Sequence, residues 1–429
     1  MKGRICSISL VSLALASALS PAALAVAGQL DSSFNGNGKA MTHFRGGDNY
    51  ARDVALQPDG RIVVVGQVLQ PSGLQPSKIA LVRFNTNGTL DISFGGDGKV
   101  RTVITHYDDG EAVVIQPNGK IVVVGRGAGN GGRFLLVRYR PSGRLDKTFS
   151  GDGVKLTNFT NGDDIAFAVA LQGDGKIIVA GAARGFNAGA SFAIARYKRH
   201  GRLDRSFGSD GRVQTNFTIL TDQARDVAIQ PDGKIVAAGA AAMFANNAES
   251  GFALARYNTD GTLDSSFDAD GKVTVGFDGG SGGAGGSGWA AGVAIQDDGK
   301  IVAAGPDDGD FALARLEIDG TPDAGFGSAG KVLTGFSGFA GAYGGLALQP
   351  DGKIVAAGTG RDFLRFALAR YETDGSLDST FSGDGKVVTH FVCCDTGAQG
   401  VAIQANGKIV AAGDQGESAS FAVARYLGG

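Results

Sequence analysis

The chain of 429 residues contains only three cysteines, four histidines and one tryptophan. Since two of the cysteines, Cys393 and Cys394, are adjacent, a disulfide framework cannot hold the fold together. We expect this pair to be incidental loop residues rather than a strained disulfide. None of the histidines lies in a metal-ligand motif such as HExxH, so we expect each to be packed or solvated rather than catalytic. These histidines are His43, His106, His200 and His390.

The chain also lacks an excess of charge of either sign. Its 40 Lys and Arg residues nearly balance its 42 Asp and Glu residues, and the formal net charge is -2. No basic tract is present that could follow a phosphate backbone. The composition therefore excludes nucleic acid as the expected partner.

The N-terminus has the three parts of a signal peptide. Lys2 and Arg4 precede an apolar run over residues 8–19, and small residues follow. The run is shorter than the ~20 residues needed to span a bilayer, so export is favoured over a membrane anchor. We predict a signal peptide over residues 1–27, cleaved after Ala25 or Ala27, no membrane span, and a secreted or periplasmic protein.

The sequence does contain a repeat. A phrase similar to LDxSF occurs seven times, at Asp31, Asp91, Asp146, Asp204, Asp264, Asp323 and Asp378. No proline-rich linker separates the copies, so the sequence predicts one domain over residues 28–429. The approximate repeats are 29–88, 89–143, 144–201, 202–261, 262–320, 321–375 and 376–429.

Each repeat carries four short apolar segments bounded by turn residues, which predicts four antiparallel β-strands. We name them strand a (DVAIQ), strand b (KIVAAG), strand c (FALARY) and strand d (GKVTxF). Strand c alternates large and small residues, so both faces of the sheet are apolar and both must be covered. Sheets stacked as wedges around an axis satisfy this requirement. The sequence therefore predicts an all-β, seven-bladed β-propeller in preference to a solenoid.

The two ends of the repeat array complement each other. A d-type segment over residues 39–44 precedes the first strand a, and the last strand c ends at Tyr426. We expect this N-terminal strand to pair with the C-terminal three strands, since closure of the ring removes two sheet edges.

Three motifs carry a resemblance to a known family. The runs LDxSFGxDGKV, VAIQPDGKIVAAG and FALARYxxDG resemble the bacterial delta-60 repeat over residues 29–429. That resemblance implies a propeller-type fold and export, and it implies no established chemistry. The departures are small, for example Leu316 in place of tyrosine in the fifth FALARY.

Most polar residues that attract notice recur in every repeat, which favours a structural role. We expect the strand-c arginines to pair with the LDxSF aspartates inside each blade, rather than to form a cationic ring for a polyanion. These arginines are Arg83, Arg138, Arg196, Arg256, Arg315, Arg370 and Arg425. The glutamines that close strand a have the same interpretation: Gln57, Gln116, Gln172, Gln230, Gln296, Gln349 and Gln404. Catalysis requires residues that occur once, so the pattern favours a non-enzymatic protein without excluding an enzyme.

The b–c and d–a loops vary strongly between copies, whereas the a–b and c–d turns are nearly constant. The face with the variable loops is therefore the candidate binding surface, although drift without function explains the variation equally well. The candidate binding residues are Phe186, Phe244, Asp278, Trp289, Asp307, Asp308 and Asp310. The leading hypothesis is an exported, monomeric, non-catalytic scaffold that binds a protein or glycan at the cell surface or in the periplasm. The alternative is a propeller hydrolase or lactonase with a divalent metal in the axial channel.

No cofactor is predicted, and a calcium site is an alternative that rests on acidic loop residues. Carboxylate oxygens suit Ca²⁺, but Asp-Gly turns explain the same residues without an ion. The residues concerned are Asp108, Asp109, Asp163, Asp164, Asp268, Asp270, Asp307, Asp308 and Asp310.

Overall fold

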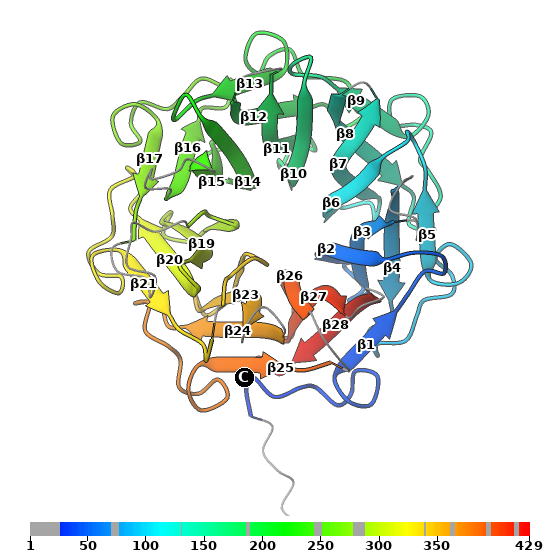
Figure 1. Cartoon of the computed structure of the whole chain (residues 1–429), viewed down its shortest axis with the longest axis vertical. Coiled ribbons are helices and arrows are strands. Elements are labelled where there is room, and N and C mark those ends of the chain that lie inside the picture. The colour runs from blue at the N-terminus through cyan, green and yellow to red at the C-terminus, as the bar shows by residue number, and fades with distance from the viewer. Residues whose placement is uncertain are drawn as a thin grey trace, which may run out of the picture.

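The protein is a seven-bladed β-propeller, in which seven four-stranded antiparallel sheets surround an axis (Figure 1). The computed structural model describes residues 26–69, 77–129, 131–185, 189–243, 251–277, 288–338, 340–360, 365–391, 396–415 and 420–429. These residues form strands and no helix, so the described part contains no helix able to cross a membrane. The predicted fold class is confirmed.

Each blade places its strand a next to the axis and its strand d at the rim (Figure 1). Blade 1 consists of β2 (Asn49–Leu56), β3 (Ile62–Val68), β4 (Lys78–Phe84) and β5 (Lys99–Thr102). Blade 2 consists of β6 (Asp108–Ile115), β7 (Ile121–Gly129), β8 (Gly131–Tyr139) and β9 (Val154–Thr157). Blade 3 consists of β10 (Asp163–Leu171), β11 (Ile177–Arg184), β12 (Ala190–Tyr197) and β13 (Arg212–Thr215). Blade 4 consists of β14 (Thr221–Ile229), β15 (Ile235–Met243), β16 (Phe252–Tyr257) and β17 (Lys272–Val275).

The remaining three blades follow the same order around the ring. Blade 5 consists of β18 (Gly292–Ile295), β19 (Ile301–Asp307), β20 (Asp310–Leu316) and β21 (Lys331–Thr334). Blade 6 consists of β22 (Leu346–Leu348), β23 (Ile354–Gly360), β24 (Arg365–Tyr371) and β25 (Lys386–Thr389). Blade 7 consists of β26 (Thr396–Ile403), β27 (Ile409–Gln415), β28 (Ser420–Tyr426) and the N-terminal β1 (Lys39–Thr42).

The ring is closed by the pairing of β1 with β28. The two strands are antiparallel, with Lys39 opposite Ala424 and Thr42 opposite Phe421. This confirms the predicted closure, although the strand ends at Thr42, two residues before the predicted segment does. Because each repeat supplies its strand d to the preceding blade, sequence repeats and blades are offset by one strand, and neighbouring blades are linked covalently.

The hydrophobic core is divided into seven clusters, and each cluster lies between two neighbouring blades. Between blades 4 and 5, Phe252 and Leu254 pack in one cluster with Ala312 and Ala314. The large face of one strand c therefore fills the space left by the small face of the next, as the alternation predicts. Complete burial of each Phe or Leu contributes about 1.5–3 kcal/mol.

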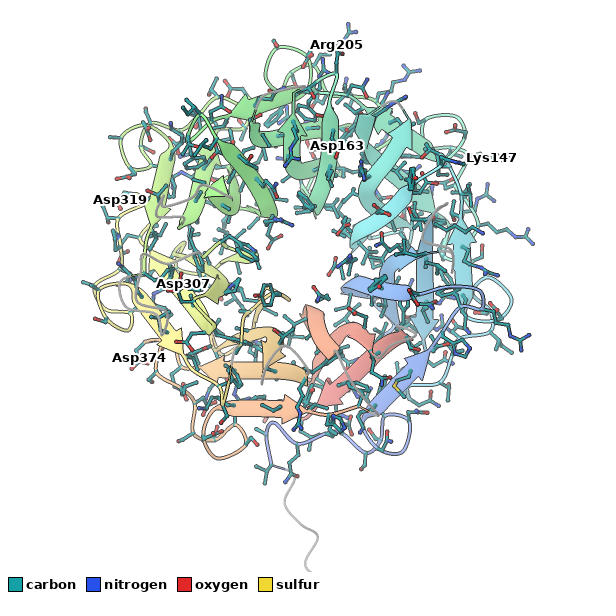
Figure 2. All side chains as sticks on the ribbon, viewed as in Figure 1. Lys147, Asp163, Arg205, Asp307, Asp319 and Asp374 are labelled. Carbon is teal, nitrogen blue, oxygen red and sulfur yellow. The ribbon has the colours of Figure 1, made fainter. Side chains whose placement is uncertain are left out.

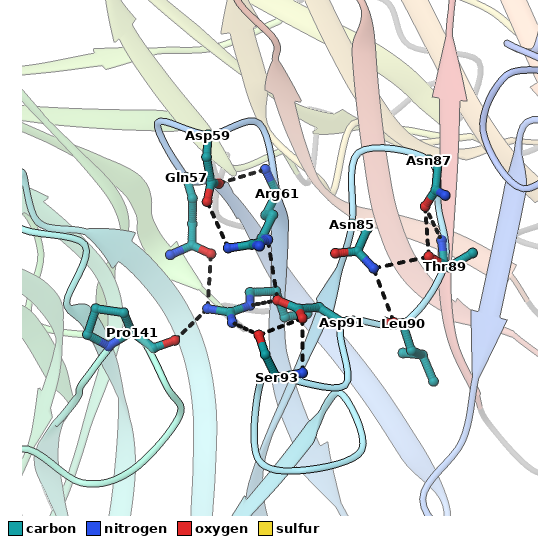
Figure 3. Close-up of polar contacts among 11 residues, drawn as sticks. Gln57, Asp59, Arg61, Asn85, Asn87, Thr89, Leu90, Asp91, Ser93 and Pro141 are labelled. Carbon is teal, nitrogen blue, oxygen red and sulfur yellow. Dashed lines mark hydrogen bonds and ion pairs between the residues drawn. The ribbon is translucent and has the colours of Figure 1, made fainter.

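Each strand-c arginine forms an ion pair with an LDxSF aspartate, at N–O distances of 2.6 to 2.9 Å. In the pair of Figure 3, the Nε of Arg83 donates to Asp91, and its Nη1 donates to the Gln57 side chain and to the carbonyl of Pro141 in the next blade. Ser93 donates its backbone N–H and hydroxyl to the other carboxylate oxygen of Asp91. The predicted structural role of the repeated arginines and aspartates is thus confirmed.

Candidate functional site

The sevenfold symmetry fails most clearly at the strands that surround the axis. Strand a has eight or nine residues in five blades, but β18 has four residues and β22 has three. In blades 5 and 6, irregular segments carrying Trp289 and Tyr343 therefore replace the first half of strand a. The inner wall of the ring thus has two unlike sides.

A cavity of about 290 Å³ lies in the axial channel at this level. It extends from the d–a loop end, marked by Trp289 and Tyr343, to the middle of strand a, marked by Arg52. Side chains from the innermost strands project into the central opening (Figure 2). One structurally equivalent position contributes a different wall residue in most of the blades, in the order Arg52, Glu111, Phe167, Arg225, Ala291, Gly344 and Gln399.

The wall of blades 1 to 4 is charged. The Arg52 Nε lies 3.9 Å from the Glu111 Oε2, and the two side chains are 34% and 21% exposed. The Arg225 guanidinium stacks over the Phe167 ring at 4.3 Å from its centroid. Burial raises the pKa of Glu111, and the positive charges of Arg52 and Arg225 oppose that rise. Burial lowers the pKa of Arg225, which the charge of Glu111 counteracts. The three charged groups therefore interact as one set across the channel wall.

Two further acids, Asp53 and Asp226, are bound to the backbone of the wall. Asp53 accepts the N–H of Val54 at 2.7 Å and that of Val113, in the next blade, at 2.8 Å. Asp226 makes the same two contacts within blade 4 and to blade 5, each at 2.8 Å. Burial raises the pKa of Asp53 to about 6 and that of Asp226 to about 7, although these hydrogen bonds act in the opposite direction. The charge of the cavity consequently changes with pH near neutrality.

The wall of blades 5 and 6 is aromatic and otherwise small. The rings of Trp289 and Tyr343 lie 5.6 Å apart at an interplanar angle of 54°. Both side chains are half-buried, and burial raises the pKa of the Tyr343 phenol. Beneath them the two backbones pack closely, since a Cβ atom at Gly292 would lie 2.7 Å from the Cα of Gly345. The backbone that carries the aromatic pair is therefore tightly packed.

Of the predicted binding residues, Trp289 lines the cavity. Phe186, Phe244 and Asp278 lie outside the described residues, as do Cys393 and Cys394. The segment over residues 306–310, expected to be a loop, is instead a tight hairpin. Asp307 ends β19, Asp310 begins β20 opposite it, and Asp308 and Gly309 have the positive φ values of a primed turn, 43° and 88°.

The three aspartates of this hairpin stay outside the cavity lining. Asp307 is only 1% exposed, and burial, with the charge of Asp308, raises its pKa to about 6. It lies behind the tryptophan segment, because a Cβ atom at Gly288 would approach its Oδ1 to 2.6 Å. The structure thus brings Asp307 near the tryptophan segment but not into the channel.

Four of the other acidic residues, expected in loops, instead begin strands, Asp108 and Asp109 in β6 and Asp163 and Asp164 in β10. Asp164 accepts the backbone N–H groups of Phe159 and Thr160, and Asp163 pairs with Arg126 at 2.8 Å. Asp270 accepts the N–H of Lys272 in its turn. Within the described ranges, no group of three or more His, Cys, Asp or Glu side chains could hold a metal ion. The four histidines are all exposed and lie away from the cavity lining.

Arg52, Glu111 and Arg225 were not predicted as site residues from the sequence. The predicted strand a begins at DVAIQ, one residue after the position that these three residues occupy. A signal was nevertheless present, because this position differs between copies while the residues after it are nearly constant. A position that differs between otherwise constant repeats therefore points to a candidate site as well as a variable loop does.

Comparisons with known proteins support the repeat architecture. A family described as "Domain of unknown function (DUF5122) beta-propeller" matches residues 57–94, 116–149, 172–207, 230–267, 296–326 and 349–381. These matches and the seven-bladed fold support a β-propeller repeat family, and they do not establish the delta-60 name. No curated protein sequence matches the chain.

Solved structures of similar overall shape come from several bacteria. A protein of unknown function from Dyadobacter fermentans is 13% identical with a TM-score of 0.48, over 91% of this chain and 97% of that one. A periplasmic gluconolactonase from Pseudomonas aeruginosa is 16% identical with a TM-score of 0.47, over 89% and 97%. An inactive virginiamycin B lyase from Staphylococcus aureus is 10% identical with a TM-score of 0.46, over 91% and 99%. At such identities and TM-scores, no activity is carried over to this chain.

Proposed function

We propose that this β-propeller repeat protein binds a saccharide in the axial cavity, at the end of the ring that carries the b–c and d–a loops. The observation that carries the proposal is the contrast between the two sides of the cavity. Trp289 and Tyr343 form an aromatic surface, and Arg52, Glu111 and Gln399 supply hydrogen-bonding groups. A sugar has apolar C–H faces that pack on aromatic rings and hydroxyl groups that exchange hydrogen bonds with polar side chains.

The size of the cavity favours a saccharide end over a protein surface. Its volume of about 290 Å³ is near the lower limit of small-molecule sites, which span roughly 300–1,000 Å³. A protein partner would instead need a broad surface, roughly 800 Å² on each side. Because the N-terminal segment predicts export, we place the ligand in the periplasm or at the cell surface.

The alternative of a metal-dependent hydrolase or lactonase has no specific observation in its favour. Among the described residues, no set of three metal-ligating side chains is present. Asp53 and Asp226 each use both carboxylate oxygens to accept backbone N–H groups. We therefore propose binding without a catalytic step.

Isothermal titration calorimetry against a panel of short neutral and acidic saccharides tests this proposal. The variant Tyr343→Ala removes one ring from the surface proposed to pack on the sugar; taking that contact as similar to an aromatic pair, about 0.5–1.5 kcal/mol, we expect roughly twofold to tenfold weaker binding. The matched control is Tyr107→Ala, because Tyr107 lies in an exposed d–a loop outside the cavity lining. Absence of binding across the panel, or an equal loss in the control, contradicts the proposal.

A further inference from the structure

We propose that the saccharide recognised by the axial cavity carries a carboxylate, as in a uronic acid, and that Arg52 and Arg225 bind this group. The inference rests on the proposed saccharide function and specifies its ligand class. Four features of the wall support it.

The first feature is the interaction of two arginines, Arg52 and Arg225, with one glutamate. Arg52 and Arg225 both act on the same Glu111, and the charge of Arg52 helps to lower the pKa of Arg225. The contact from Arg52 to Glu111 is 3.9 Å, longer than a hydrogen bond, and the Arg52 Nε makes no hydrogen bond. Glu111 is thus the carboxylate that both guanidinium groups act on, and its 3.9 Å contact to Arg52 is an ion pair without a hydrogen bond. The Arg52 side chain is 34% exposed, so a carboxylate that enters the channel would meet its guanidinium and add a second acceptor for the two cations.

The second feature is that the other acids of the wall are already engaged. Both oxygens of Asp53 and both oxygens of Asp226 accept backbone N–H groups that join neighbouring blades. These carboxylates are therefore fixed to the wall and are not arranged as hydrogen-bonding partners for the arginines. Burial also raises the pKa of each, so their negative charge decreases below neutral pH.

The third feature is the orientation of Arg225. The Cζ of its guanidinium lies 4.3 Å from the centroid of the Phe167 ring, and this cation–π contact restrains the group. A planar guanidinium presents N–H donors along its edges in a fork that matches a carboxylate. Lysine at this position would not provide the same geometry.

The fourth feature is the position of the aromatic pair. Trp289 and Tyr343 belong to the d–a segments of blades 5 and 6, across the axis from blade 2, which supplies Glu111 (Figure 1). A uronic acid could place its ring against the aromatic side and its carboxylate toward the arginines. A small free anion would make no contact with the aromatic rings. A neutral sugar would bring no carboxylate to the arginines.

The single tryptophan of the chain provides a direct assay, because Trp289 lines the cavity. Its fluorescence would be titrated with galacturonic acid, the methyl ester of galacturonic acid, galactose and acetate. Because hydrogen bonds to charged groups are the strong ones, galacturonic acid is expected to bind about tenfold more tightly than the other three probes. Lowering the pH from 8 to 6 should strengthen the binding of the two carboxylates, galacturonic acid and acetate, and leave that of galactose and the methyl ester unchanged, since Asp53 and Asp226 gain protons while both carboxylates stay ionised.

Two variants of one ion pair separate recognition from structural damage. Arg52→Gln should reduce the affinity for galacturonic acid to that for its methyl ester. Glu111→Gln should increase the affinity, because it removes the internal competitor for the arginines. Loss of folding would weaken binding in both variants, so opposite changes identify recognition. Arg126→Gln is the control, because Arg126 pairs with Asp163 outside the cavity lining.

The outcomes distinguish the two proposals. Equal binding of galacturonic acid, its ester and galactose overturns the carboxylate inference and leaves the saccharide function standing. Acetate that binds as tightly as galacturonic acid also overturns the inference, because the site would then recognise charge alone. If no sugar changes the Trp289 fluorescence of the wild type, both proposals fail.

Discussion

Removal of the Asp31 carboxylate should open the ring at its closure point. One carboxylate oxygen accepts the Nε of Arg425 at 2.7 Å and the Nζ of Lys408 at 2.8 Å, and the other accepts the backbone N–H and hydroxyl of Ser33. Burial alone would raise the pKa of Asp31, but the hydrogen bonds of Lys408 and Ser33 and the charge of Arg425 outweigh it and hold the pKa well below its usual range. The ionised carboxylate therefore stabilises the closed ring at neutral pH.

The size of the effect follows from the burial of the pair. Asp31 and Arg425 have side chains that are 6% exposed, and removal of one partner of a buried pair costs about 3–5 kcal/mol. We expect the variant Asp31→Ala to raise the opening constant of β1 by roughly 100-fold or more. Asp264→Ala is the matched control, because Asp264 has equivalent contacts to Arg256, Lys234 and Ser266 inside blade 4.

Hydrogen exchange measured by mass spectrometry reports the opening of each strand separately. In Asp31→Ala, the amides of β1 should exchange much faster, because β1 is joined to its partner β28 by contacts and not by a neighbouring turn. In Asp264→Ala, the amides of β17 should change less, because residues 258–271 connect β17 directly to its partner β16. Equal acceleration in the two variants, or unchanged exchange of β1, would refute the reasoning.

Three further predictions concern single positions. Gly239→Ala should destabilise the protein by at least about 1–3 kcal/mol in thermal unfolding, because the new Cβ would lie 1.8 Å from a backbone oxygen of β14, whereas Gly173→Ala, with no atom within 4 Å, should be nearly neutral. Val275→Thr should lower the melting temperature, because burial of its unpaired hydroxyl costs about 1–3 kcal/mol. The added change Leu316→Tyr should recover part of this loss, because it restores the Tyr–Thr hydrogen bond found between other blades. Burial raises the pKa of Asp226 from 3.8 to about 7, so its contribution to stability is fully present below pH 3.8 and is lost progressively as the pH rises to about 7. Asp226→Asn should therefore flatten the decline in wild-type stability between about pH 4 and 7, and an unchanged pH profile in denaturant titrations would contradict this.

Much of the fold was predictable because each sequence pattern occurs in seven copies. The alternation of large and small residues in strand c predicted that both faces of each sheet are covered. The position of a d-type segment before the first strand a predicted that β1 closes the ring. The Leu316 departure was visible in the sequence, but its reason was not. In the fold Leu316 packs in one cluster with Val275, which stands where other blades have the threonine partner of the tyrosine.

The candidate site was predictable only in part. Trp289 was found because the loop before it is unusual, whereas Arg52 and Arg225 lie in strands that look regular. A register shift between Ala224 and Asp226 interrupts the alternation of strand a, which hid the first half of the strand. Which of these side chains share a cavity depends on the closed ring, because they come from different blades and meet only at the axis.

A crystal structure of the full chain with galacturonic acid tests the central claim most directly. The claim predicts the sugar in the axial cavity, with its ring against Trp289 and Tyr343 and its carboxylate at Arg52. An empty cavity with the sugar bound on another surface of the propeller would contradict it.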